Sequence, residues 1–174
     1  MAVNRGKQFE SVIQEAFEHI PNLSITRLHD QTTGFKGSTN PCDFIAYHKP
    51  YLIPIECKSK HTSTLSIFSN PKPDKNGVLH GFYGDITDKQ WAGLLEMSLI
   101  KGVIPGVLVW FVDKNVTVFY HIKSLEMLRN AGDKSVRYDN DFIGVVVPGV
   151  KKRVFFEYDM EQFLKNLEDL YGTR

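Results

Sequence analysis

The sequence predicts an α/β fold in which a central mixed β-sheet is flanked by helices. Apolar residues at helical spacing open the chain, three strand-like segments follow, and helical and strand-like segments then alternate towards the C-terminus. The chain has 174 residues and a hydrophobic content of 42%, which is enough for one sizeable buried core. We therefore expect residues 1–174 to form a single domain.

The N-terminal part is expected to contain one helix and three strands. Apolar residues repeat at helical spacing over about 7–20, and Pro21 ends this pattern. Strand-like segments follow at 24–28, 44–47 and 52–57. A turn at 48–50 would join the last two strands as a hairpin.

The C-terminal part is expected to begin with a helix over about 87–101 that ends at Gly102. The segments 106–112 and 116–121 would form a second hairpin. The remaining expected elements are, in chain order, a short helix at 124–129, strands at 142–147 and 153–156, and a closing helix at 159–170.

The clearest functional signal lies between residues 40 and 60. Side chains alternate along a strand, so Glu56 and Lys58 would share one face while Ile55 and Cys57 point to the core. The hairpin would bring Asp43 beside Glu56. Paired carboxylates at strand ends suit Mg²⁺, which activates water and neutralises developing charge, and Lys58 could stabilise charge on a scissile phosphate. The predicted chemistry is therefore phosphodiester hydrolysis.

A plain structural interpretation of the same residues stays open. Asp43 could cap the start of a strand, and Glu56 with Lys58 could be a surface pair without a catalytic role. The alternation, the apolar flanks and the short hairpin favour the functional interpretation over this one.

The same residues resemble a known nuclease signature. Residues 41–43 (Pro-Cys-Asp) and 56–58 (Glu-Cys-Lys) are similar to the PD-(D/E)xK motif, with a Cys inserted between the Pro and the Asp. Together with segments 4–10 and 87–90, they make nearly the whole chain resemble the RecU-type Holliday junction resolvases of Gram-positive bacteria and their phages. The resemblance implies a restriction-endonuclease-like core.

The resemblance also implies roles for individual residues. Asp43 and Glu56 would bind the metal with the backbone carbonyl of Cys57, and Lys58 would be the catalytic lysine. Glu10 would reach the site from the first helix as a further metal ligand or through water.

Two more residues gain a role only from the resemblance. Gln90 would steady the site from a later helix, and Arg5 would contact DNA phosphate. From sequence alone, Gln90 and Glu10 would be ordinary helix-surface residues, and Arg5 would lie in an uninformative terminus.

The chain departs from the family in two places. RecU proteins carry a long stalk-like insertion before the catalytic Asp, whereas here only residues 29–40 separate the first strand candidate from the motif. Conversely, the Pro- and Gly-rich segment 69–84 is longer than expected and would be a mobile loop facing the substrate. Phe82 and Tyr83 in this segment are candidates for contacting a base.

The formal net charge of +1 is not that of a strongly basic DNA-binding protein, so nucleic-acid binding would depend on local charge. Residues 151–153 form a basic run that could bind phosphate or could simply be solvated surface. The candidate DNA-binding residues are Arg5, Lys36, Lys60, Lys72 and Lys75.

The sequence argues against other classes of site. Cys42 and Cys57 are expected to be reduced packing residues, and the six histidines have no zinc-type spacing. Neither a signal peptide nor an apolar run of about 18 residues is present, which predicts a cytoplasmic protein without membrane contact.

These observations predict a Mg²⁺-dependent endodeoxyribonuclease, with Mn²⁺ as a substitute, that resolves four-way DNA junctions by paired symmetric nicks. The expected partners are branched DNA, a second copy of the chain in a homodimer, and a recombinase in DNA recombination and repair. Two alternatives stay open: another PD-(D/E)xK nuclease, such as a phage exonuclease or a restriction-like enzyme, and a non-catalytic junction-binding protein.

Overall fold

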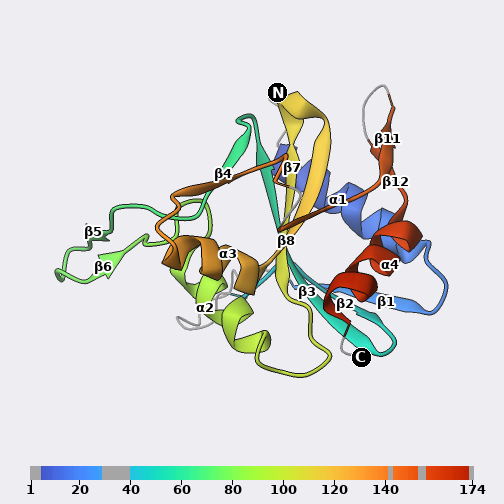
Figure 1. Cartoon of the computed structure of the whole chain (residues 1–174), viewed down its shortest axis with the longest axis horizontal. Helices are drawn as coiled ribbons and strands as arrows, with labels where there is room; N and C mark the ends of the chain where they lie inside the picture. The colour runs from blue at the N-terminus through green and yellow to red at the C-terminus, as the bar shows by residue number, and fades with distance from the viewer. Residues whose placement is uncertain (1–4, 29–39, 141–142, 153–155, 173–174) are drawn as a thin grey trace.

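The computed structural model describes residues 5–28, 40–140, 143–152 and 156–172. Within these ranges a six-stranded sheet forms the centre of the molecule, in the order β1-β2-β3-β7-β8-β10 (Figure 1). The β3–β7 pair is parallel and the other neighbouring pairs are antiparallel, so the sheet is mixed. The predicted α/β class with a mixed central sheet is confirmed.

The elements have the following bounds. The strands of the sheet are β1 (Leu23–Arg27), β2 (Phe44–His48), β3 (Tyr51–Lys60), β7 (Gly106–Phe111), β8 (Val116–His121) and β10 (Gly144–Val146). The helices are α1 (Arg5–Glu18), α2 (Asp88–Met97), the short η1 (Val112–Lys114), α3 (Ile122–Asn130) and α4 (Met160–Tyr171). Separate two-stranded ribbons pair β4 (Thr64–Ser66) with β9 (Ser135–Arg137), β5 (Lys72–Pro73) with β6 (Leu79–His80), and β11 (Gly149–Lys151) with β12 (Phe156–Tyr158).

Helices cover both faces of the sheet. In Figure 1, α1 and α4 lie on one side, and α2 and α3 lie on the other. Two buried clusters match this arrangement, because Leu108 of β7 packs with the first pair of helices while its neighbours Val107 and Val109 pack with the second pair. The described part of the chain contains no helix long and apolar enough to cross a membrane.

Strand β3 was predicted from the sequence, but the structure extends it and buries more of it than we expected. We expected Ile55 and Cys57 to face the core and Glu56 to lie on the other face, but residues 53–57 are all buried. The strand also continues to Lys60 instead of ending at residue 57, because β7 pairs with it in parallel from Ile55 onwards. The central strand of a sheet covered on both sides is buried on both faces, so its polar side chains need partners.

Helix α2 begins at a capping box. The Thr87 hydroxyl accepts a hydrogen bond from the Gln90 backbone N–H, and the Gln90 side chain accepts one from the Thr87 N–H. The helix ends at Met97, earlier than predicted, because Ser98 caps it and donates from its hydroxyl to the Leu95 carbonyl at 2.6 Å.

The segment 69–84 is more regular than the loop that we expected. It contains the β5–β6 hairpin, in which Lys72 pairs with His80 and Pro73 with Leu79. The Asp74 carboxylate accepts hydrogen bonds from two backbone N–H groups of the turn, which the composition of the segment did not reveal.

Candidate active site

The β2–β3 hairpin places Asp43 beside Glu56, as the sequence predicted. The Asp43 N–H donates to the Ile55 carbonyl at 3.0 Å, and Asp43 Oδ2 accepts from the Cys57 N–H at 2.7 Å. These two bonds fix Asp43 directly before β2 and direct its carboxylate towards the middle of β3.

Glu56 is the centre of the site. Only 2% of the residue is exposed. Its Oε1 atom accepts from Gln90 Nε2 at 2.6 Å and lies 2.8 Å from Lys58 Nζ, whereas its buried Oε2 atom has no hydrogen-bond partner in the described part of the chain. A buried carboxylate oxygen that accepts no hydrogen bond costs free energy unless it binds a cation or shares a proton, and, besides burial, hydrogen bonding with the Asp43 carboxyl group is one of the causes that raise the pKa of Glu56.

The surroundings of Glu56 change its acidity. Burial raises the pKa of Glu56 from 4.5 to about 7, with Lys58 lowering it and the nearby Asp43 carboxylate raising it further. Near neutral pH the protonated and the ionised forms of Glu56 are therefore both populated. A cation at the site would favour the ionised carboxylate.

Gln90 is held so that its amide serves both the helix and the site. Its Oε1 atom accepts the Thr87 N–H at 3.0 Å and lies 3.4 Å from Lys58 Nζ. Its Nε2 atom is therefore directed towards Glu56. The capping box of α2 fixes the side-chain orientation that the site requires.

Glu10 comes from α1 and pairs with Arg27 of β1. Burial raises the pKa of the Cys57 thiol well above its usual value, and the charges of Asp43, Glu56 and Glu10 raise it further, in that order. The Glu10 carboxylate is therefore close enough to affect the site. Its role as a metal ligand stays a prediction.

The sequence interpretation missed Arg27. This residue shares the inward face of β1 with Leu23 and Ile25, and its guanidinium lies 5.9 Å from the centre of the Phe44 ring. A charged residue on the inward face of an alternating strand was the signal that could have identified it.

The residues fit a metal site that is completed by substrate and water. No group of three or more His, Cys, Asp or Glu side chains in the described ranges could enclose a metal ion. Asp43 and Glu56 supply two carboxylates, and Mg²⁺ is commonly held by one or two carboxylates together with waters and phosphate oxygens. The thiols do not fit this role, since burial raises the pKa of Cys42 to about 12 and that of Cys57 well above 9.0.

The candidate DNA-binding residues are spread over the molecule. Arg5 is exposed at the start of α1, and Lys72 and Lys75 are exposed on the β5–β6 hairpin. Lys60 is half-buried, and its Nζ atom donates to Asp85 Oδ1 at 2.6 Å. Lys36 lies outside the described residues.

Tyr83 does not present a free face to a base. Its ring stacks on Trp91 with centroids 4.6 Å apart, and the Arg129 guanidinium lies 4.4 Å from its centre. Trp91 is buried in one core cluster, and the partly buried Trp110 packs against the other.

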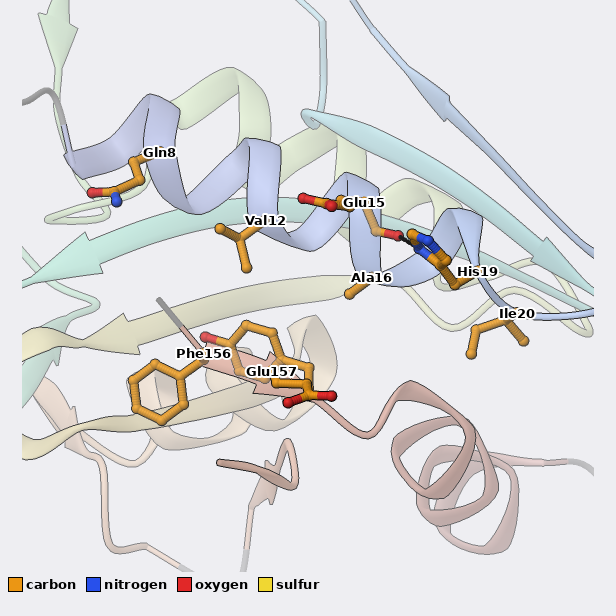
Figure 2. A pocket seen from close by; sticks show the side chains of 9 residues that line it. Gln8, Val12, Glu15, Ala16, His19, Ile20, Phe156 and Glu157 are labelled. Atoms are coloured by element: carbon orange, nitrogen blue, oxygen red, sulfur yellow. Dashed lines mark hydrogen bonds between the residues drawn. The ribbon is translucent and has the colours of Figure 1, made fainter. Parts of the chain in front are cut away.

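A groove of about 760 Å³ lies away from these residues, between α1 and β12. Figure 2 shows Val12 and Ala16 of α1 on one side of the groove and Phe156 on the other. Glu15 and Glu157 also line the groove. Neither Asp43 nor Glu56 lines it, so the groove is separate from the candidate site.

Comparisons with known proteins give distant similarities. No family model matches the chain. The SPbeta prophage-derived uncharacterized protein YotM of Bacillus subtilis (strain 168) is 27% identical over 186 residues, which cover 95% of this chain and 88% of YotM. Among solved structures, the Holliday junction resolvase Hjc of Archaeoglobus fulgidus is similar with a TM-score of 0.42 and 14% identity, over 70% of this chain and 78% of Hjc.

Proposed function

We propose that this protein is a metal-dependent endodeoxyribonuclease that resolves four-way DNA junctions. The observation that carries the proposal is the buried Glu56, whose Oε1 atom is held by Lys58 and Gln90 while its Oε2 atom has no partner in the described chain, next to the Asp43 carboxylate. This combination suits a hard cation together with a phosphodiester substrate.

Each residue has a defined task in this proposal. Bound Mg²⁺ or Mn²⁺ would supply neutralisation of charge and activation of water. Asp43 and Glu56 would hold the ion, with Gln90 orienting Glu56. The Lys58 side chain is 22% exposed, so its ammonium group can donate to an oxygen of the scissile phosphate.

The finer assignment to the RecU type rests on the resemblance of residues 41–43 and 56–58, and the similarity to a prophage protein supports a phage origin. Paired nicks on opposed strands of a junction require two sites related by a two-fold axis, so we propose that the protein acts as a homodimer. A recombinase is the proposed protein partner, and the cytoplasm is the proposed location.

The test is cleavage of a synthetic mobile four-way junction, compared with matched duplex and single strand, in Mg²⁺, Mn²⁺ or EDTA. Asp43→Asn keeps an oxygen that can accept the Cys57 N–H but removes the charge. Asp169→Asn, at an exposed position of α4, is the matched control.

Symmetric, metal-dependent nicks on the junction alone, absent in Asp43→Asn and retained in Asp169→Asn, would support a resolvase. Equal cutting of duplex DNA would make the protein a general nuclease of the same chemistry. Junction binding without cutting in either metal would overturn the catalytic proposal and leave a binding protein.

A further inference from the structure

The β5–β6 hairpin stands away from the rest of the molecule. Residues 72–81 are all exposed, ten in succession, and a Cβ atom added at Gly77 or Gly81 would have no neighbour within 4 Å. Figure 1 shows the two strands extending outwards beyond α2. The hairpin therefore contributes little to the buried core.

Hydrogen bonds within the turn nevertheless give the hairpin a defined shape. Asp74 Oδ1 accepts from the N–H groups of Asn76 at 2.8 Å and Val78 at 2.9 Å, and Gly77 adopts a positive φ of 80° in the turn. An isolated two-stranded hairpin is only marginally stable in water. The turn contacts thus maintain the shape of an element that has no core to pack against.

The base of the hairpin is tied to the helix that serves the candidate active site. The Asp88 carboxylate accepts from the N–H groups of Gly81 and Phe82, both at 2.9 Å. Asp88 is the first residue of α2, two positions before Gln90. A ligand gripped by the hairpin would therefore be positioned relative to Glu56.

A second connection joins the hairpin segment to β3. Asp85 accepts from Lys60 Nζ at 2.6 Å and from the Ser66 N–H at 2.8 Å. Lys60 is two residues beyond Lys58 on the same strand. Both the strand and the helix that carry the proposed catalytic residues thus hold the hairpin segment.

The surface of the hairpin complements nucleic acid. Lys72 and Lys75 are exposed and outnumber the one carboxylate of the hairpin, Asp74, which accepts hydrogen bonds within the turn and lies 3.4 Å from His80. Val78 and Leu79 are 52% and 49% exposed. A two-stranded β-ribbon fits into the DNA major groove. Apolar side chains of DNA-binding proteins can also insert between base steps where the stack opens.

We propose that the β5–β6 hairpin is an arm that grips a duplex segment of the DNA substrate next to the branch point, with Lys72 and Lys75 on the phosphates and Val78 and Leu79 against exposed bases. This inference rests on the proposed function, since it takes DNA as the ligand of the site. It assigns the recognition of the branch point to the hairpin.

The test separates binding from cleavage by measuring junction affinity in EDTA, as a function of salt, in the Asp43→Asn background. The slope of log affinity against log salt concentration is negative. In the Lys72→Gln, Lys75→Gln double variant it should become shallower by about 1.8, because each lost phosphate contact contributes about 0.9. Lys101→Gln with Lys165→Gln, at two exposed positions outside the hairpin, should leave the slope unchanged.

A second pair of variants tests the apolar side chains. Val78→Ser with Leu79→Ser should reduce the preference for junction over duplex while the salt slope stays the same. All four positions are exposed, so these variants are expected to fold, and circular dichroism checks this.

The outcomes distinguish the two proposals. An unchanged slope in the Lys72/Lys75 variant of a protein that cleaves junctions overturns the arm alone. If the wild-type protein never cleaves DNA but the Lys72/Lys75 variant shows a reduced salt slope, the arm is supported and the nuclease is overturned. If the wild-type protein binds no DNA, both proposals are overturned.

Discussion

The side-chain amide of Gln90 donates to Glu56 Oε1 over 2.6 Å while its oxygen accepts the Thr87 N–H that starts α2. The helix cap and the carboxylate at the centre of the candidate site are therefore one hydrogen-bonded unit. The position of Glu56 depends on how α2 begins.

The first prediction distinguishes the effect of the α2 helix cap on stability from the effect of the Gln90–Glu56 contact on cleavage. Thr87→Ala removes the hydroxyl acceptor but leaves the contact of Gln90 with Glu56, and it should cost about 0.5–2 kcal/mol of stability with cleavage retained. Gln90→Ala removes both contacts and should lower cleavage about 10–100-fold, as for other residues that orient metal ligands. Urea unfolding and junction cleavage measure the two effects. Equal losses of cleavage in both variants would mean that Gln90 acts only through the helix.

The raised pKa of Glu56 predicts how stability depends on pH without divalent metal. The folded protein holds a proton on Glu56 up to about pH 7, whereas the unfolded chain loses it near 4.5, so this contribution is complete at low pH and is lost as the pH rises through 7. The size of this contribution is about 3 kcal/mol. Unfolding in urea with EDTA should show this loss in the wild type and not in Glu56→Gln.

A second buried group, His121, also makes stability depend on pH and must be separated from the effect of Glu56. Burial lowers the pKa of His121 to about 4, which makes stability rise with pH between about 4 and 6.5, opposite to the effect of Glu56. The difference between wild type and Glu56→Gln removes this background, since both proteins contain His121. A difference that stays constant from pH 5 to pH 8 would show that Glu56 is ionised throughout.

The central pair of the site follows from local sequence. A short turn joins two strands of fixed alternation, so Asp43 had to meet Glu56 across the hairpin, and Lys58 had to share the face of Glu56. The capping residue Thr87 and the glutamine three positions later also follow from local rules. These parts of the site depend on contacts within short stretches of chain.

The remaining features arise from contacts that no local pattern encodes. Glu56 is held by Gln90, 34 positions away in the sequence, and Tyr83 is covered because Trp91 stacks on its ring and the Arg129 guanidinium lies over it. Lys60 looks like a free basic residue in the sequence, but Asp85, 25 positions away, holds its ammonium group. Such long-range pairs depend on the tertiary arrangement.

The pairing of Glu10 with Arg27 predicts a test of the role of Glu10. If the pair only ties α1 to β1, Glu10→Gln and Arg27→Gln should lose similar stability, and the double variant should show a coupling energy of about 0.5–1 kcal/mol. If Glu10 also assists the site, only variants that contain Glu10→Gln should lose metal-dependent cleavage beyond the effect on stability. Urea unfolding and cleavage assays on the four proteins distinguish these cases.

The stack of Tyr83 between Trp91 and Arg129 predicts a structural role instead of contact with a base. Tyr83→Ala should lower the free energy of unfolding by about 2–3 kcal/mol, because it removes a half-buried ring together with its aromatic and cation–π contacts. Tyr83→Phe keeps the ring and should be close to wild type.

Affinity for single-stranded DNA, measured below the unfolding transition of each variant, tests whether the Tyr83 ring contacts a base. It should be the same in the wild type, Tyr83→Phe and Tyr83→Ala, since the covered ring has no face left for a base. A Tyr83→Ala protein of wild-type stability that binds single strands more weakly would instead assign base stacking to Tyr83, and would require the ring to leave Trp91 when DNA binds.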